Sequence, residues 1–217
     1  MKIPSINISA KQWSFYLSYL IFSITSSFKI LINTTPFYKL LMSIYNIPNQ
    51  VSLNSSDIYE DFSALMKYLT SFTLLDFPLK YFRYSPEGKF HFEEVRILFL
   101  KMDLLFWLSF FVVIVLLCLH RKTLFDLFEG YVMFLKLSIF LLIALVIPIS
   151  INFSWWFEKF HKLFFNNNDW LFDPLTDPII NILPEEVFSS YLAAIIFIFL
   201  IFLSLPLIIT KKSPRRL

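Results

Sequence analysis

Four long apolar runs dominate this chain and limit what it can fold into. They cover about residues 13–32, 103–119, 131–149 and 191–209. Each approaches the ~20 apolar residues that an α-helix needs to cross the hydrocarbon core of a bilayer. A helix satisfies all of its backbone hydrogen bonds within one segment, as lipid requires. The sequence therefore predicts an all-α integral membrane protein with four transmembrane helices, forming one domain over residues 1–217.

Composition agrees with this class and excludes several others. Apolar residues make up 57% of the chain, whereas about 45–50% is usual for soluble proteins. The net charge of +3 comes without a basic stripe, which argues against nucleic-acid binding. The chain has only two glycines, too few for a glycine-rich phosphate loop or a dinucleotide fingerprint. We therefore expect neither a nucleotide nor a nucleotide cofactor.

The charges that flank the apolar runs predict the orientation of the chain. Basic residues lie before the first run, between the second and third, and after the fourth. They are Lys2, Lys11, Arg121, Lys122, Lys211, Lys212, Arg215 and Arg216. Short loops on the cytoplasmic side carry such an excess of Lys and Arg. We expect both termini in the cytoplasm and segments 33–102 and 150–190 on the extracytoplasmic side of the cell membrane.

Two lysines, Lys29 and Lys136, fall inside apolar runs. Each lies near an end of its run, so we expect both side chains to extend toward the membrane interface.

The first extracytoplasmic segment carries a pattern for an amphipathic helix. After a Ser/Asn start, residues Ile58, Phe62, Leu65 and Leu69 recur at helical spacing. Their common apolar face predicts a helix that covers the membrane bundle. Further on, Ser85-Pro86 is typical of a helix start, with Ser as the cap and Pro at the first helical position. We expect that helix to continue into the second span.

The second extracytoplasmic segment is rich in turn signals. Asp173-Pro174 and Asp177-Pro178 force extended or turn conformations, because the residue before proline avoids the helical region. Pro184, followed by two glutamates, predicts the start of the fourth span. The stretch 155–186 is therefore predicted to be a tight, ordered loop.

Three histidines are the main candidates for chemistry. His120 lies at the cytoplasmic end of the second run and is expected to be interfacial. His91 and His161 come from the two extracytoplasmic segments, each beside carboxylates and aromatic residues. Imidazole, with a reference pKa of ~6.5, suits proton transfer near neutral pH.

Other catalytic and metal-binding patterns are missing from the sequence. It contains neither an HExxH run nor a PCxxC run, and it has no GxSxG. The lone cysteine, Cys118, lies in an apolar run, where a thiol is a poor nucleophile. We therefore expect no metal and no cofactor, and a substrate that brings its own nucleophile.

Two motifs resemble the lipoprotein intramolecular transacylase family of Gram-positive bacteria. They are "FHFEEVRILF" and "FHKLFFNNNDWLFDPLTDPIINILPEEVF", set among four spans of matching order and sidedness. The resemblance implies an acyltransferase that acts on diacylated lipoproteins entering from the outer leaflet. It implies transfer of the sn-2 acyl chain to the α-amino group of the N-terminal cysteine, which gives an N-acyl, lyso-form lipoprotein. By their place in the motifs, His91 and His161 match the two functional histidines of the family.

From this we hypothesise that one histidine takes the proton of the amine. The other would hydrogen-bond the developing oxyanion or protonate the departing glycerol oxygen; we assign the base to His161, with the reverse order left open. Asp169 or Asp173 would hold the second nitrogen of His161, and Glu94 would do the same for His91. Asp173 could instead cap its own turn, and Glu94 could lie on a solvated helix face.

Two other functions fit parts of the pattern. A non-catalytic membrane scaffold would use the extracytoplasmic segments to bind a partner. A lipid hydrolase would use the same two histidines with water as the nucleophile.

Overall fold

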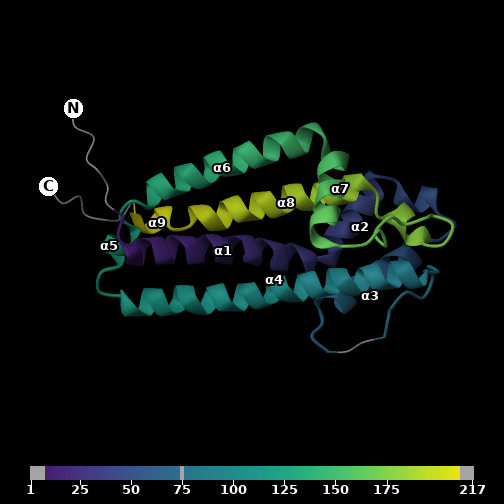
Figure 1. The fold of residues 1–217 in the computed structure, drawn as a ribbon, viewed down its shortest axis with the longest axis horizontal. Helices are drawn as coiled ribbons and strands as arrows, with labels where there is room; N and C mark the ends of the chain where they lie inside the picture. Colours follow the sequence, from purple (N-terminus) through teal and green to yellow (C-terminus); the bar gives the residue numbers. More distant parts are fainter. Residues whose placement is uncertain (1–7, 74–75, 211–217) are drawn as a thin grey trace. The chain divides into compact units, whose positions relative to one another are not determined.

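The computed structural model describes residues 8–73 and 76–210, and every regular element among them is helical. Figure 1 follows the chain through these elements. They are α1 Ala10–Ile32, α2 Thr35–Ile44, η1 Ile47–Gln50, α3 Ser55–Thr70, α4 Pro86–Leu119, α5 Leu124–Phe128, α6 Tyr131–Ile151, α7 Phe153–Phe164, η2 Pro178–Ile182, α8 Glu185–Ser204 and α9 Leu207–Thr210, where η marks a 3-10 helix.

Four stretches of helix are long and apolar enough to cross a membrane. They are Ala10–Ile32, Pro86–Leu119, Leu124–Ile151 and Glu185–Ile209. The predicted all-α fold with four spans is confirmed. The 34-residue α4 also confirms that the helix starting at Pro86 continues into the second span. Most of the basic residues used to predict sidedness (Lys2, Lys211, Lys212, Arg215 and Arg216) lie outside the described residues, so the orientation stays a prediction.

The described residues divide into two compact units. The first, here called the bundle unit, comprises residues 8–27, 104–150 and 196–210; the second, the site unit, comprises residues 28–73, 76–103 and 151–195. Helices α1, α4 and α8 contribute residues to both, and α6 contributes its last residue, Ile151, to the site unit.

In the bundle unit, buried aromatic side chains pack together, and two of the tyrosines also donate hydrogen bonds to backbone carbonyls. Tyr19 donates its hydroxyl to the Phe202 carbonyl at 2.7 Å, and Tyr131 donates to Leu203 at 2.6 Å. These carbonyls lie at the end of α8, just before Pro206, which has no N–H to offer Phe202. The Phe202 carbonyl also accepts the Leu205 N–H at 3.1 Å, and the two tyrosine hydroxyls add side-chain donors that stabilise this helix end.

The spans differ in how much protein covers them. Half of the apolar window of α1 is buried, against 11% for each of the second and third candidate spans and 17% for the fourth. The uncovered side chains on these three are mostly large and apolar, which suits contact with lipid tails. α1 is therefore the most protein-covered of the four spans.

In the site unit, α3 is the amphipathic helix that the sequence predicted. Asn54 caps it by accepting a hydrogen bond from the Asp57 N–H. The four predicted apolar positions (Ile58, Phe62, Leu65 and Leu69) are all buried. From α2, Tyr38 stacks on Phe62 with ring centroids 3.6 Å apart and donates to the Ile182 carbonyl at 2.8 Å.

The buried carboxylate of Asp61 holds the chain segment that follows α3. It is 1% exposed and accepts hydrogen bonds from the N–H groups of Lys80, Tyr81 and Phe82 at 2.8–3.0 Å. Three charge-assisted bonds offset the cost of burying a carboxylate. They fix the segment that leads into α4.

The second segment differs from the loop predicted for it. Its first part is helix α7, capped by Asn152, which accepts from the Trp155 N–H at 3.0 Å. Phe153, Phe157, Phe160 and Phe164 recur every three or four residues, a helical period that the turn signals farther along obscured. The remainder, from Phe165 to Leu183, is turns and a 3-10 helix, and α8 begins at Glu185 as predicted.

Candidate functional site

His91 and His161 meet in the site unit. His91 lies in the second turn of α4, and His161 lies near the end of α7. Their ring centroids are 5.8 Å apart, and the rings are inclined at 39°. Both side chains are buried, at 6% and 9% exposure. The pairing expected from two segments 70 residues apart in sequence is thus present in the structure.

The first turn of α4 is fixed by a residue from the second segment. Asp177 accepts a hydrogen bond from the Ser85 N–H at 2.8 Å, and the Ser85 hydroxyl accepts one from the Gly88 N–H at 2.9 Å. Thr176 donates to the other oxygen of Asp177 at 2.7 Å. A carboxylate at a helix N-terminus is favourable because the unpaired N–H groups point at it. This contact fixes the helix one turn before His91.

Gly88 allows this close approach. A Cβ added there would lie 2.9 Å from the Asp177 Cγ and 3.2 Å from the Ser85 Oγ. One of the two glycines of the chain is therefore required by packing at the helix start.

The tautomer of His161 follows from its neighbour on α7. Its Nδ1 lies 2.7 Å from the Phe157 carbonyl oxygen. A carbonyl can only accept, so Nδ1 carries the proton and Nε2 of the neutral ring has a free lone pair. His161 is therefore suited to accept a proton at Nε2.

Trp170 and Asn167 support the other side of His161. The indole stacks on the imidazole with centroids 4.9 Å apart, and its Nε1 donates to the Asn167 carbonyl at 3.0 Å. The Asn167 amide in turn donates to both carboxylate oxygens of Glu94, at 3.0 and 3.1 Å. Glu94 lies one turn beyond His91 on α4. Asn167 thus connects α4, which carries His91, to Trp170, which stacks on His161.

Aromatic rings enclose the two imidazoles. Phe165 contacts both of them, with centroids 4.7 Å from His91 and 5.7 Å from His161. Phe172 lies edge-on to His91 at 5.5 Å, and Phe157 lies 4.3 Å from His161. The surroundings of the pair are therefore mostly apolar.

This burial sets the protonation state of the pair. Both histidines lie outside the apolar run 103–119. Desolvation, and secondarily the nearby His161, lower the pKa of His91 to about 4. Desolvation also lowers the pKa of His161, against a smaller opposite effect of the bond to Phe157. Both rings are neutral at pH 7, so one can accept a proton while the other donates a hydrogen bond.

The three carboxylates predicted as supports do not hydrogen-bond the imidazoles in the described part of the chain. The second nitrogen of His161, expected to bind Asp169 or Asp173, is bound to the Phe157 carbonyl. Asp173 accepts from the Leu175 N–H at 2.8 Å and so caps its own turn, the alternative left open for it. At Asp169 it is the backbone N–H that is held, by the Asn167 side-chain oxygen, and no hydrogen bond joins its carboxylate to His161 among the described residues. Glu94 binds Asn167, whereas the Nδ1 of His91 is buried without a hydrogen-bond partner among the described residues.

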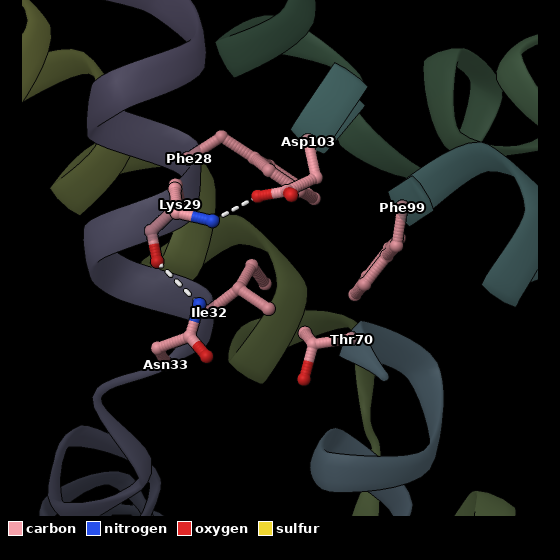
Figure 2. Close-up of a pocket in the computed structure, with 7 residues that line it drawn as sticks. All are labelled: Phe28, Lys29, Ile32, Asn33, Thr70, Phe99 and Asp103. Atoms are coloured by element: carbon pink, nitrogen blue, oxygen red, sulfur yellow. Dashed lines mark hydrogen bonds and ion pairs between the residues drawn. The ribbon is translucent and has the colours of Figure 1, made fainter. Parts of the chain in front are cut away.

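A second polar cluster of the site unit surrounds a cavity of about 50 Å³. Figure 2 shows the ion pair between Lys29 on α1 and Asp103 on α4 at this cavity. Lys29 was expected to extend toward the membrane interface, which stays a prediction; its acidic partner on α4 was not predicted. The other lining residues are Phe28, Ile32, Asn33, Thr70 and Phe99.

Within residues 8–73 and 76–210, no three His, Cys, Asp or Glu side chains gather closely enough to hold a metal ion. The two neutral imidazoles can transfer protons and form hydrogen bonds.

Sequence reasoning missed Phe165, Asn167, Trp170 and the pair Gly88–Asp177. The three asparagines in a row were noted, but nothing in the sequence distinguishes Asn167 from its neighbours. Glycine occurs only twice in the chain, so its presence at the start of a predicted helix was a usable signal for close packing at Gly88.

Known proteins resemble the chain in sequence and in structure. A family model described as "Lipoprotein intramolecular transacylase Lit" matches residues 13–188. A search of curated proteins gives no match. The solved structure of the membrane-integral lipoprotein intramolecular transacylase Lit from Bacillus cereus superimposes with a TM-score of 0.86 at 26% identity, covering 93% of each chain.

Two further structures of that protein, with a histidine replaced by arginine or by alanine, give TM-scores of 0.80 at 26% identity. They cover 93% of this chain and 89% and 90% of theirs. With its four apolar helices and this family match over most of its length, the chain belongs to the lipoprotein intramolecular transacylase family of membrane-integral acyltransferases.

Proposed function

We propose that this protein moves the sn-2 acyl chain of a diacylglyceryl-cysteine lipoprotein to the α-amino group of the same cysteine. The observation that carries the proposal is the pair of buried, neutral imidazoles, 5.8 Å apart, in a membrane protein of this family. No side chain there offers a better nucleophile, and this reaction needs none, because the substrate amine attacks.

His161 acts as the general base. Its Nδ1 proton is held by the Phe157 carbonyl, which leaves Nε2 free to accept. The amine nitrogen attacks the ester carbonyl carbon as Nε2 removes one of its protons. The carbon–oxygen bond to glycerol then breaks, and the imidazolium returns the proton to the departing glycerol oxygen. The products are an amide and a free glycerol hydroxyl.

His91 stabilises the oxyanion. With a pKa of about 4 it is uncharged at pH 7, so it does not supply a proton as an imidazolium acid. A neutral ring still donates one N–H hydrogen bond to the oxygen that becomes negative in the tetrahedral intermediate. The two histidines therefore have different tasks, set by their different surroundings.

Positioning contributes the remaining catalysis. Amine and ester belong to one molecule, so holding them in contact makes the attack nearly unimolecular, which can lower the barrier by ~7–11 kcal/mol. The amine must be neutral to attack, and its ordinary pKa of ~8 leaves most of it protonated at pH 7. A base beside it is therefore useful.

The orientation is part of the proposal. The basic residues near both ends of the chain and in the connection between the second and third spans support cytoplasmic termini. On this orientation the histidine pair works at the extracytoplasmic face of the cell membrane, and the lipoprotein reaches it from the outer leaflet.

The test is expression of the wild-type chain in a host whose lipoproteins are diacylated with a free α-amine. Mass spectrometry of the N-terminal lipopeptides should show the total mass unchanged, with one acyl chain now amide-linked and one glycerol hydroxyl free. Fatty acid release with a free amine would instead indicate a hydrolase. Unchanged lipopeptides from well-expressed protein would contradict the proposal and favour a scaffold.

A further inference from the structure

The proposed transfer has a competitor that uses the same two histidines. Water deprotonated by His161 could attack the same ester carbonyl, form a carbon–oxygen bond and release a free fatty acid and the glycerol hydroxyl. The α-amine would then stay unmodified. A transacylase that works in this way must therefore keep water from the carbonyl while the amine is held there.

Among the described residues, Phe165 is the one whose ring contacts both imidazoles. It is 4% exposed, yet it belongs to neither of the two apolar clusters that form the cores of the bundle and site units. Its ring contacts are edge-on to His91 at 4.7 Å and tilted against His161 at 5.7 Å. Its burial thus comes from the histidine site.

The backbone conformation and one hydrogen bond fix the position of the Phe165 ring. Phe165 follows the last residue of α7, in an extended conformation with φ −124° and ψ 128°. Its N–H donates to the His161 carbonyl at 2.8 Å, which ties it to the helical turn that carries the base. The preceding Phe164 is 50% exposed, and its ring contact is with Phe160. Two adjacent phenylalanines therefore have opposite environments.

We infer that Phe165 is a specificity-determining residue that excludes water from the reacting carbonyl and so commits the acyl chain to the amine. An ordered water needs two to four polar partners. Beside the imidazoles, the wall formed by Phe165, Phe172 and Phe157 offers rings in place of such partners. The inference rests on the proposed function, because it concerns the partition of one acyl chain between two nucleophiles.

The test compares three variants with the wild type in the lipopeptide assay. Phe165→Ala opens room for a water beside both imidazoles. Phe165→Leu keeps an apolar side chain but removes the ring. Phe164→Ala is the matched control, since it removes an identical ring one residue away that contacts neither histidine. The readout is the ratio of the hydrolysed product, a lyso-lipopeptide with a free amine, to the N-acyl product.

We expect Phe165→Ala to raise this ratio roughly tenfold, which corresponds to a barrier difference of about 1.4 kcal/mol between the two reactions. Phe165→Leu should give a smaller rise, and Phe164→Ala should leave the ratio at the wild-type value. The ratio is an internal standard, so a general loss of folded protein does not change it.

Three results would overturn the inference. The first is an unchanged ratio in a Phe165→Ala protein that still transfers. The second is loss of both products from folded Phe165 variants, which would make the ring necessary for catalysis itself. The third is failure of both Phe165 variants to fold, which would make the ring a packing residue. If the wild type forms no N-acyl product, the proposed function has failed, a result distinct from these three.

Discussion

The two units bury different kinds of polar group. In the bundle unit the buried polar side chains are uncharged: Gln12, Ser23, Thr25, Ser26, Ser27 and Ser109. In the site unit they are all ionisable: Asp61, His91, His161 and Asp177. An unpaired buried carboxylate is far more costly than an unpaired hydroxyl, so Asp61 and Asp177 in particular need specific partners.

The buried hydroxyls of the bundle unit and the buried carboxylates of the site unit also differ in where their partners lie, although Gln12 and the tyrosines of the bundle unit bind distant carbonyls. In the bundle unit, Ser23, Thr25 and Ser27 each return a hydrogen bond to a carbonyl four residues earlier on the same helix, at 2.7–2.9 Å. In the site unit, Asp177 binds Ser85, which is 92 residues away. Local pairing follows from the helix, whereas distant pairing needs the whole fold. Substitutions in the site unit should therefore change activity or stability through a partner far away in sequence.

The largest effect is expected for His161→Ala, which removes the proposed base. Transfer should fall by about 10²–10⁴-fold, the usual contribution of general acid–base catalysis. His120→Ala, in the bundle unit, is the matched control and should keep the wild-type rate. Initial rates of N-acyl lipopeptide formation measure both. A comparable loss in the two variants would contradict the contrast between the units.

His91→Ala should reduce transfer by about 10²–10³-fold, the cost of losing one oxyanion donor. His91→Asn offers an amide N–H from a shorter side chain, so it should recover part of the loss. If His91→Asn and His91→Ala are equally inactive while folded, the proposed hydrogen-bond donation is wrong and the imidazole acts in another way.

Gly88→Ala tests the packing of the second segment on α4. The added methyl overlaps the Asp177 carboxylate, and such overpacking should lower the free energy of unfolding by about 1–3 kcal/mol. The double variant Gly88→Ala, Asp177→Ala removes the obstacle and should recover part of that loss. Thermal unfolding in detergent micelles gives the comparison. If the double variant recovers none of the lost stability, overlap with Asp177 is not the cause of the destabilisation.

Asn167→Ala removes the link between Glu94 and the loop that carries Trp170. Hydrogen bonds to a charged group contribute about 1.5–3 kcal/mol, and Glu94 would be left without this partner. We expect a loss of kcat at little changed KM. Asn166→Ala, exposed and adjacent, is the control and should behave as wild type. Equal effects at both positions would make the asparagine run a general feature of the loop.

The smallest effect expected is a change in the pH profile. Burial lowers the pKa of His161, so its neutral, proton-accepting form persists below pH 6.5. The rate should therefore rise with pH up to about 8, where the substrate amine becomes neutral, with a second decline below pH 6.5.

Trp170→Ala uncovers His161, so it should raise that pKa and move the lower decline to higher pH. Trp155→Ala removes an indole that contacts Trp156 and Lys159, and it should leave the profile unchanged. A lower decline that stays in place in Trp170→Ala would contradict the assignment of this pKa to His161.

Predictions from the sequence succeeded where a structure depends on neighbouring residues. The cap at Asn54, the start of α4 at Pro86 and the start of α8 at Glu185 all follow from short patterns. Helix α7 was missed because its apolar period was short and preceded several turn signals. The ion pair of Lys29 was not predicted, because its partner, Asp103, lies on another helix.

Within the candidate site, the two histidines were selected from the sequence because histidine is rare in the chain and each lies in a distinctive motif, and the fold brings them together. Their partners were not. Asp169 and Asp173 were expected to bind His161, but a backbone carbonyl one turn earlier on the same helix makes that bond. A sequence pattern shows which side chains are present, so it does not indicate that a backbone carbonyl is the hydrogen-bond partner.

By itself the sequence determined the helical membrane class and the number of spans, and it singled out His91 and His161 as candidates, because hydrophobic length, helix caps and rare residues are local properties. Only the tertiary structure decided that Asp177 packs on Gly88, that Asn167 connects Glu94 to Trp170, and that Phe165 lies against both imidazoles. These contacts join residues from different elements. Their energies depend on distances and burial that exist only once the chain has folded.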